Sequence, residues 1–479
     1  MQLAFVPLYI KYLGIEAYGL IGIFATLQAW LVLLDLGMRP SLGREMARFT
    51  AGKGDAESIR DLLRSVEVVA LTMGVLVGLV IVAVSGTVAN HWLNSQALPP
   101  EAASHAIALM GAIAALRLVE NVYVSSIVGL QRQVLENAFS SVLATARGLG
   151  AVAVVIWVSP SIQAFFIWQA VVSVVSTMLF AKLAWSVLPK GCRRPRFSVP
   201  RLRGIWRFAS GMTAISFLGL LLTQVDKILL SRLLSLEVFG YYALAGAVAG
   251  ALYSLVGPIT TACYPRLTQL VARADQNALR AEYHHGAQLI SVLMGSAGII
   301  LVVFGDKVLL LWTADPALVA NAAPILRVLA FGTLLNGLMW LPYQLQLAHG
   351  WTKLTVKVNA AAVAVLIPAL VWITPIYHAV GAAWVWVVLN AGYVLIAVGL
   401  MHRRILPSEK WRWYGQDTAL PLLAAAATAW LCRAAVPDGM GRFSDTVVLL
   451  AVATAVVGVA ALAAPSIREG LLFRGALKS

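Results

Sequence analysis

The sequence has little charge and little cysteine, and it lacks the loop that binds nucleotide phosphates. Only 12% of its 479 residues are charged, against about 25% in an ordinary soluble protein, which excludes a soluble globular domain. The three cysteines, Cys192, Cys263 and Cys432, are far apart and provide neither a disulfide framework nor a zinc site. Gly52-Lys53 lacks the upstream glycine of a G-x-x-x-x-G-K-[ST] loop, so an NTPase site is excluded. We therefore predict no cofactor and no metal.

Long apolar runs make up most of the chain. Hydrophobic residues account for 60% of it, and the mean hydropathy is +0.83. The runs are about 20 residues long, enough for a helix to cross about 30 Å of hydrocarbon. Because backbone groups in lipid must be hydrogen-bonded within their own segment, we expect helices and an all-α polytopic membrane protein. Thirteen full spans are expected, at 17–36, 66–89, 103–129, 133–158, 160–185, 208–231, 238–262, 286–312, 319–348, 356–374, 379–401, 416–435 and 445–464.

The segment from Met1 to Ile10 is apolar but too short to span. It is interpreted as the second half of a truncated first span, which raises the expected number to about 14. It has no basic n-region and no cleavage site, so it is not interpreted as a signal peptide.

The basic residues predict the orientation in the membrane. With the half-span counted as the first, 27 of the 36 Lys and Arg residues lie in the loops after even-numbered spans and in the C-terminal tail. The loops on the opposite side hold five. Basic residues collect on the cytoplasmic side, so we expect a cytoplasmic C-terminus. A basic rim against anionic lipid also accounts for the net charge of +15 without a nucleic acid partner.

The chain contains a long internal repeat. Leu13-Gly14-Ile15-Glu16-Ala17-Tyr18-Gly19 returns 221 positions later as Leu234-Ser235-Leu236-Glu237-Val238-Phe239-Gly240. A repeat of this length indicates a duplicated half-molecule, which is typical of alternating-access transporters. We expect two pseudo-symmetric six-helix lobes and two accessory C-terminal helices. The expected parts are an N-terminal lobe at 1–185 with an incomplete first helix, a basic cytoplasmic linker at 186–203, a C-terminal lobe at 204–402, and accessory helices 13 and 14 with a cytoplasmic tail at 403–479.

Several short motifs carry a family resemblance over nearly the whole chain. They are Val6-Pro7-Leu8-Tyr9-Ile10, the first copy of the repeat, Asp35-Leu36-Gly37, and Gln224-Val225-Asp226-Lys227-Ile228-Leu229-Leu230. These motifs resemble the Wzx-type O-antigen and exopolysaccharide flippases. Those proteins belong to the multidrug/oligosaccharidyl-lipid/polysaccharide exporter superfamily.

The resemblance implies a V-shaped, two-lobed bundle with a central cavity in the bacterial inner membrane. It implies a flippase that moves a polyprenyl-diphosphate-linked oligosaccharide from the cytoplasmic to the periplasmic leaflet, for cell-surface polysaccharide synthesis. The polar head would cross inside the cavity while the polyprenyl tail stays among the membrane lipids. A polysaccharide polymerase and a chain-length regulator are the candidate protein partners.

Charged residues inside the apolar spans are the candidate substrate-binding groups. Arg117, Glu120 and Asn121 lie near the middle of one span, and Arg147 lies near the middle of the next. An Arg at mid-span costs about 2.5–3.5 kcal/mol on insertion scales and usually faces a partner or a wet cavity. Guanidinium matches the oxygens of phosphate, so a cluster of net charge +1 fits a diphosphate. The alternative is a structural ion pair that joins the two spans.

Other polar positions are secondary candidates. Arg327, in the external third of its span, is a further candidate for the substrate. Asp226 is a candidate ion-coupling carboxylate, with a capping or packing role as the alternative, and Asp35 is expected to pair with Arg39. His284 and the histidine after it are expected to be exposed and not to bind a metal.

Two other classes of function are the alternatives to a flippase. A cation-coupled drug or small-molecule antiporter of the same superfamily would need carboxylates for cationic substrates, whereas this chain has arginines at mid-span. A polysaccharide polymerase, ligase or glycosyltransferase would need a sizeable external loop or catalytic domain, and the outer loops here are short. The sequence thus favours a transporter of an anionic substrate over an enzyme.

Overall fold

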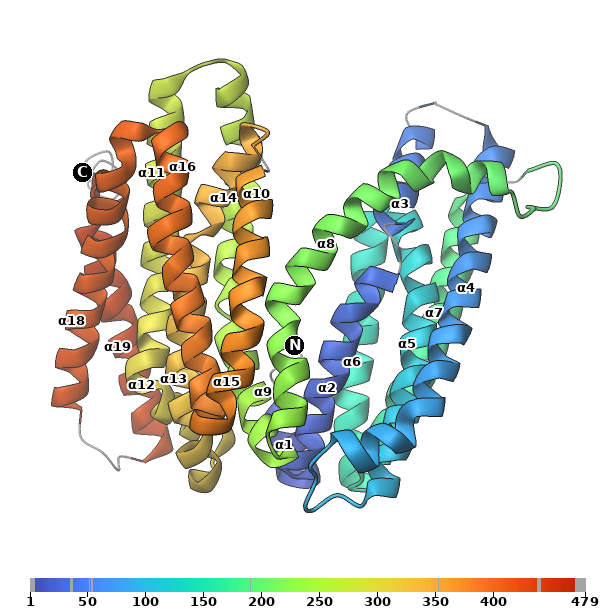
Figure 1. Cartoon of the computed structure of the whole chain (residues 1–479), viewed down its shortest axis with the longest axis horizontal. Coiled ribbons are helices and arrows are strands. Elements are labelled where there is room, and N and C mark those ends of the chain that lie inside the picture. Colours follow the sequence, from blue (N-terminus) through green and yellow to red (C-terminus); the bar gives the residue numbers. More distant parts are fainter. Residues whose placement is uncertain are drawn as a thin grey trace. The chain divides into compact units, whose positions relative to one another are not determined.

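The computed structural model describes residues 5–34, 38–50, 52, 55–189, 191–351, 353–436 and 441–469 (Figure 1). These residues form helices joined by short loops, and the β contact found among them is an isolated bridge between Asn94 and Ser235. The chain divides into two compact units, Met1–Gly240 and Tyr241–Ser479. The all-α fold is confirmed, while the expected lobe boundaries at 185 and 204 stay a prediction.

The described residues of the first unit form eight helices and the start of a ninth. They are α1 (Val6–Leu13), α2 (Ile15–Leu34), α3 (Met38–Thr50), α4 (Ala56–Thr87, continued by the π-turn η2, Val88–Trp92), α5 (Pro100–Gly129), α6 (Gln133–Trp157), α7 (Ile162–Val187), α8 (Val199–Leu233) and α9 (Leu236–Gly250). Local sequence explains several starts. Asp55 caps α4 by accepting a hydrogen bond from the Ser58 backbone N–H, and Ser161 caps α7 in the same way. Proline occupies the first position of α5, where its missing N–H costs nothing.

The core of the first unit forms where α4, α5 and α7 pack together. On the α4 side, Gly74 lies so close to α5 that a Cβ atom there would be 2.9 Å from the carbonyl oxygen of Ala115. The short helix α3 also joins this core, since Leu42 and Met46 are completely buried. Helix α3 is therefore a packed element of the unit. The expected partner of Arg39, Asp35, lies outside the described residues.

The two copies of the repeated motif contact each other inside the first unit. A Cβ atom on Gly19 would be 2.8 Å from the carbonyl oxygen of Leu236, and one on Gly240 would be 2.5 Å from that of Ile15. Gly19 and Gly240 are equivalent positions of the repeat, and so are Ile15 and Leu236. Each copy therefore places its glycine against the other's backbone, and only glycine allows this approach without a shift.

The second unit contains the remaining helices. They are α10 (Tyr253–Ala272), α11 (Gln276–Ile290), α12 (Ser296–Thr313), α13 (Pro316–Leu338), α14 (Trp340–Ala348), α15 (Lys353–Gly392), α16 (Val398–Arg404), α17 (Lys410–Arg412), α18 (Leu420–Ala435) and α19 (Arg442–Ala463), with the π-turns η3 (Ser291–Gly295), η4 (Tyr393–Ala397) and η6 (Trp413–Ala419) and the 3-10 turn η5 (Pro407–Glu409).

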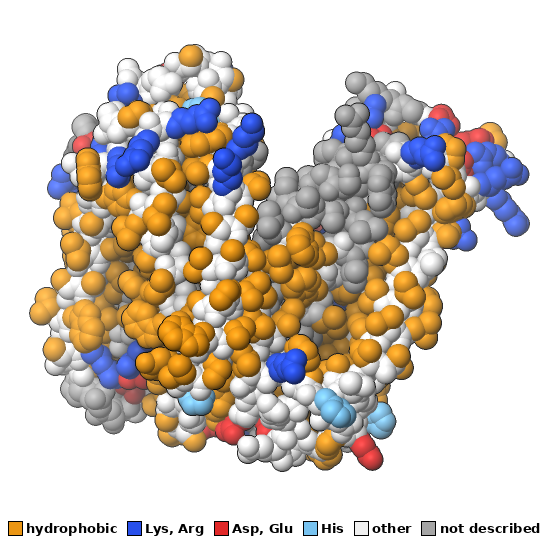
Figure 2. Space-filling view, viewed as in Figure 1, with side chains coloured by type: hydrophobic (Ala, Val, Ile, Leu, Met, Phe, Trp, Pro, Cys, Tyr) orange, Lys and Arg blue, Asp and Glu red, His pale blue; other side chains and the backbone are white. Residues whose placement is uncertain are grey.

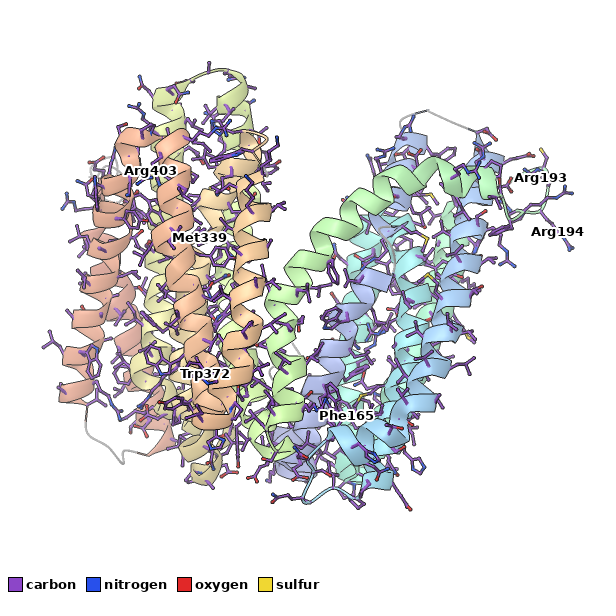
Figure 3. All side chains as sticks on the ribbon, in the orientation of Figure 1. Phe165, Arg193, Arg194, Met339, Trp372 and Arg403 are labelled. Atoms are coloured by element: carbon purple, nitrogen blue, oxygen red, sulfur yellow. The ribbon has the colours of Figure 1, made fainter. Side chains whose placement is uncertain are left out.

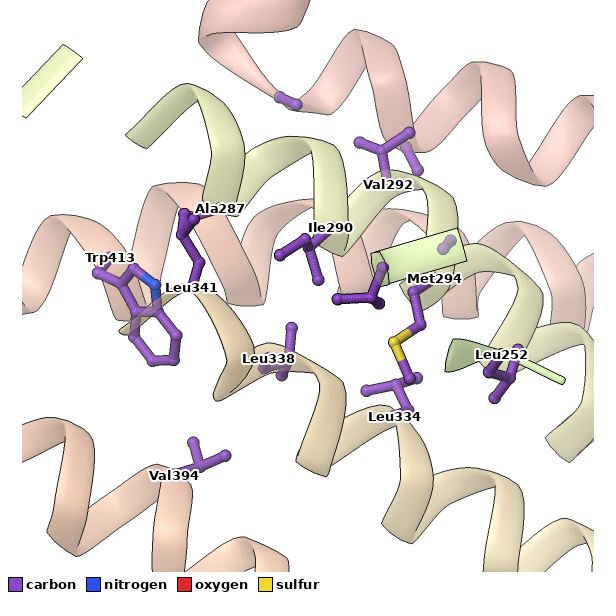
Figure 4. Packing of buried hydrophobic residues seen from close by; sticks show 14 of the residues in the cluster. Leu252, Ala287, Ile290, Val292, Met294, Leu334, Leu338, Leu341, Val394 and Trp413 are labelled. Carbon is purple, nitrogen blue, oxygen red and sulfur yellow. The ribbon is translucent and has the colours of Figure 1, made fainter. Parts of the chain in front are cut away.

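The core of the second unit runs through α10 to α14 and is continuous with the accessory helices α18 and α19. Figure 4 shows Met294 pointing toward Leu334 on α13, with Leu338 one turn further along. The sulfur of Met294 occupies the space beside Gly337, where a Cβ atom would be only 2.0 Å away. Residues Ala425, Ala429, Val456 and Ala460 of the accessory pair are completely buried. The accessory pair is therefore packed as part of this unit.

The helices bear out the multi-pass membrane fold. Ten helical stretches in the described chain are long and apolar enough to cross a membrane, with a shorter one at Ile15–Leu31. Within the described residues, each of the thirteen expected spans lies largely on helix, although 356–374 and 379–401 share one continuous stretch, Lys353–Arg404. In each unit, apolar side chains cover the middle of the visible face and most of the visible Lys and Arg side chains lie near the upper end, with a smaller group near the lower end of the second unit (Figure 2).

Candidate functional site

The mid-span charges of the first unit meet in a buried cluster on α5, α6 and α7. One terminal nitrogen of Arg147, Nη2, lies 3.3 and 3.2 Å from the two carboxylate oxygens of Glu120 and donates to the Ser176 hydroxyl at 3.0 Å. The Glu120 side chain is 7% exposed and that of Arg147 11%. The antiparallel packing of α5 and α6 brings together residues 27 positions apart. The structure thus joins Arg147 to Glu120, which is the ion pair between the two spans that the sequence analysis gave as the structural alternative.

Arg117 approaches the same carboxylate more loosely. Its Nη1 is 4.0 Å from Glu120 Oε1, and its side chain is 22% exposed. The Nε atoms of Arg117 and Arg147 are buried, and neither has a hydrogen-bond partner in the part of the chain that the structure describes. Two cations and one anion give the cluster a formal charge of +1. The neighbouring Asn121 is half-buried. The cluster therefore keeps both positive charge and unsatisfied N–H donors.

The cluster lies far from both helix ends. Arg147 is 10 residues from Trp157, the end of α6, or about 15 Å at 1.5 Å per residue. The backbone around it is held by side chains of other helices. Tyr9 of α1 donates to the carbonyl oxygen of Gly148 at 3.1 Å, and Gln169 of α7 donates to that of Arg147 at 3.4 Å. Helix α1 thus reaches the residue next to Arg147.

An aromatic cluster borders this region. Tyr9 meets Phe165 edge-on with ring centroids 5.2 Å apart, and Phe166 lies between Phe165 and Phe24 in the same geometry. Phe165 lies near one end of the first unit (Figure 3). These rings pack α1 and α2 against α7, the helix that carries Ser176 of the cluster.

Arg327 belongs to the second unit, whereas the cluster on α5 to α7 belongs to the first. It is on α13 and pairs with Asp306 at 3.2 Å, and Asp306 also accepts from Arg433 at 3.0 Å. Its side chain is 44% exposed. The structure therefore does not bring Arg327 together with Arg117 and Arg147 within one unit, and its role as a substrate contact stays a prediction.

Asp226 lies on α8, half-buried. Next to it, the ammonium group of Lys227 donates to the Thr223 carbonyl oxygen at 3.2 Å and to Gln224 Oε1 at 3.0 Å. The ion-coupling role of Asp226 is likewise untested by these contacts.

A polar cluster in the second unit was missed by the sequence analysis. His284, expected to be exposed, is 1% exposed. Its Nδ1 bonds to Asp417, and its Nε2 lies 3.0 Å from Glu409 Oε2. Gln288 donates to the same Asp417 at 2.8 Å. The expectation failed because the helix turn that covers His284 is 133 residues away in the sequence.

The basic linker is also held more firmly than its sequence indicates. Arg193 donates to both carboxylate oxygens of Asp61 on α4, at 3.1 and 2.5 Å, and the backbone N–H of Arg196 donates to the same carboxylate at 2.8 Å. Arg193 and Arg194 stand at the edge of the first unit in Figure 3. Asp61 therefore fixes the linker to the first unit, and no pattern in the sequence indicated this contact.

Comparison with solved structures shows the fold. A multidrug resistance MATE family transporter of the MOP superfamily in an inward-facing conformation is 13% identical, with a TM-score of 0.70 over 84% of this chain and 94% of that one. The lipid II flippase MurJ, in an inward closed conformation, is 11% identical, with a TM-score of 0.68 over 96% of both chains. A MOP superfamily transporter from Pyrococcus furiosus is 14% identical, with a TM-score of 0.52 over 84% of this chain and 88% of that one.

Comparison of the sequence with family models gives two matches. Residues 212–373 match the family MatE. No curated protein matches the chain. Residues 1–271, more than half of the chain, match the family described as polysaccharide biosynthesis protein. On that match and on the shared fold, the chain belongs to the polysaccharide biosynthesis protein family and is a multi-pass membrane protein with the fold of the MOP superfamily transporters.

Proposed function

We propose that this protein is a flippase that moves a polyprenyl-diphosphate-linked oligosaccharide from the cytoplasmic to the periplasmic leaflet of the bacterial inner membrane, by alternating access. The observation that carries the proposal is the buried cluster of Arg117, Glu120 and Arg147, with its formal charge of +1 and two Nε donors that the described residues leave unsatisfied. Arg327 in the second unit is a further candidate contact to the substrate.

The chemistry of the cluster fits a diphosphate better than a cation. One carboxylate is already bonded to Arg147 at 3.2 Å, so it has little attraction left for a cationic substrate. Guanidinium groups donate from a planar fork that matches two oxygens of a phosphate, and charge-assisted hydrogen bonds of this kind are about twice as strong as neutral ones. The competing function, a cation-coupled drug or small-molecule antiporter, requires an acidic site instead.

The family supports polysaccharide synthesis as the process served. A polysaccharide polymerase and a chain-length regulator are the partners that such a flippase would work beside, and the product at the cell surface would be an O-antigen or an exopolysaccharide. The cytoplasmic location of the C-terminus belongs to the same proposal.

A transport assay tests the function. The purified protein is reconstituted into proteoliposomes with a fluorescent polyprenyl-diphosphate oligosaccharide, and its transfer between leaflets is followed by the fraction that an impermeant quencher reaches. We expect transfer by the wild type, strong loss with Arg147→Ala and partial activity with Arg147→Lys. The matched control is Arg132→Ala, which removes an exposed arginine beside the start of the same helix.

The two functions predict opposite results. Uptake or release of a cationic dye against a proton or sodium gradient, with no transfer of the lipid-linked sugar, would establish the antiporter and reject the flippase.

A further inference from the structure

The stretch α15 to α16 is folded back on itself as a hairpin. His378, with φ 50° and ψ −146°, breaks the helical conformation and separates a first leg from a second. The two legs run side by side, since the Tyr393 hydroxyl on the second donates to Asn359 Oδ1 on the first at 2.7 Å. In Figure 1 the orange ribbon turns back at its lower end. The legs therefore form two walls that meet at one end.

Between the two legs lies a groove of about 900 Å³. On the first leg the lining includes Ala361, Val365 and Ala369, and on the second Trp384, Val388 and Gly392. These positions recur every three or four residues on each leg, as expected for one face of a helix. Val365 and Val388 are 65% and 69% exposed. The walls are thus apolar and open on one side.

The groove has room for a chain beside Gly392. No atom lies within 4 Å of a Cβ atom built on Gly392, so the space in front of that residue is empty. Trp384 is 50% exposed and forms part of the wall.

Positive charge marks one end of the hairpin only. From Lys353 to Arg404 the hairpin contains no Asp or Glu, and its Lys and Arg residues are Lys353, Lys357, Arg403 and Arg404. Lys357 stands one helical turn before Ala361 of the lining, on the same face, and Lys353 one turn earlier. Figure 3 places Arg403 near one end of the hairpin and Trp372 near the other. A long apolar groove with cations at one mouth matches a long-chain lipid with an anionic head.

The length of the groove separates a polyprenyl chain from an ordinary phospholipid. The lining of the first leg extends over 20 residues, from Val358 to Tyr377, or about 29 Å along a helix. One leaflet is about 15 Å deep, half of the roughly 30 Å hydrocarbon core. The groove is therefore longer than one leaflet is deep, and its whole length exceeds the reach of a chain confined to one leaflet.

We propose that the two legs of α15 hold the polyprenyl chain of the lipid-linked substrate when it first binds, with its phosphate beside Lys353, Lys357 and Arg403 before the diphosphate reaches the arginine cluster. The site rests on the proposed function for the identity of its occupant. It assigns the apolar tail a place on the second unit, separate from the arginine cluster on α5 to α7.

A cross-linking experiment tests this site without requiring transport. The full chain in lipid nanodiscs is irradiated with polyprenyl phosphate that carries a diazirine on its chain, and the labelled peptides are mapped by mass spectrometry. We expect labelling within 358–396, with competition by unlabelled polyprenyl phosphate and little by phosphatidylglycerol. Gly392→Leu, which fills the groove, should reduce labelling about tenfold, or ~1.4 kcal/mol.

The matched control is Gly458→Leu on α19, where a Cβ atom also meets nothing within 4 Å. It makes the same substitution on a membrane helix outside the groove and should leave labelling unchanged. The triple variant of Lys353, Lys357 and Arg403 to Gln should weaken labelling by the phosphate but not by the corresponding polyprenyl alcohol.

Three results would overturn the site: labelling elsewhere in the chain, equal competition by phosphatidylglycerol, or no effect of Gly392→Leu. Failure of the flippase proposal gives a different result: the wild type does not transfer the substrate between leaflets, whether or not the lipid labels the groove. If both proposals hold, Gly392→Leu slows transfer of the long-chain substrate more than that of an analogue with a short isoprenoid chain.

Discussion

Replacing Arg147 and Glu120 singly and together separates a transport role from a structural ion pair. Arg147→Met leaves the Glu120 carboxylate, 7% exposed, with Arg117 at 4.0 Å as its remaining cation. Removing one partner of a buried pair costs about 3–5 kcal/mol in soluble proteins. Coupling energies between polar groups in membranes average only about 0.6 kcal/mol, with a maximum of about 1.7. We therefore expect a loss of stability of about 1–3 kcal/mol.

The double variant Arg147→Met/Glu120→Leu removes both buried charges. Replacing a buried pair by apolar residues of similar size is often neutral or stabilising, so its stability should return to within about 1 kcal/mol of the wild type. Its formal charge also returns to +1, from Arg117. Transport should nevertheless stay low, because the donors of Arg147 are gone. A charge-assisted hydrogen bond is worth about 1.5–3 kcal/mol, or about a 10- to 150-fold loss.

The measurements are thermal unfolding in detergent and the initial rate of transfer in proteoliposomes, at matched protein amounts. The informative comparison is between the single variant Arg147→Met and the double variant. If the double variant transports at the wild-type rate, Arg147 serves only to neutralise Glu120 and the cluster is structural.

Three further predictions concern the contact between the repeats, the orientation and the energy source. Gly19→Ala should destabilise the protein by about 1–3 kcal/mol, as overpacking does, because its Cβ atom would be 2.8 Å from a backbone oxygen. The control Gly250→Ala should leave the stability unchanged, because no atom lies within 4 Å of its Cβ atom. Equal melting temperatures of the two variants would contradict this prediction. In a variant that keeps only Cys192, which is exposed, an impermeant maleimide should label the thiol only after cells are permeabilised, and labelling in intact cells would reverse the orientation. Outward movement of a diphosphate with about two charges gains on the order of 4–5 kcal/mol at 100 mV, inside negative. An imposed membrane potential should therefore drive transfer, and the Asp226→Asn variant should keep this activity. Transfer that follows only a proton or sodium gradient and is lost in Asp226→Asn would make that carboxylate the coupling site.

The span pattern could be predicted from sequence because each span is a local property. A run of about 20 apolar residues must become a helix in lipid whatever surrounds it, and the described residues of the thirteen expected spans lie largely on helix. The two spans at 356–374 and 379–401 were separated correctly as apolar blocks, yet the turn between them at His378 keeps helical hydrogen bonding on both sides. Hydropathy located the two legs but could not show the groove between them.

The candidate site could be predicted in part for the same reason. Arg117, Glu120 and Arg147 are conspicuous because charge at mid-span is costly. Neighbouring spans are antiparallel, so residues near the middle of each span are expected at similar depths in the membrane. The third contact, Ser176 on α7, carried no such signal, since a serine in a membrane helix is ordinary. The face that each helix turns toward its neighbours depends on tertiary packing, and the sequence of a single span does not determine that packing.

The sequence by itself determined the membrane-spanning character of this protein, the order of its helices and the presence of buried charge at mid-span, since each follows from the cost of placing polar groups in hydrocarbon. Tertiary structure alone decided the partners. It placed His284 between Asp417 and Glu409, set Gly19 against the backbone of Leu236 and Gly240 against that of Ile15, and bonded Arg147 to Glu120. These contacts join residues 27 to 225 positions apart, where helical periodicity carries no information and the close approach of particular helices selects the pairs.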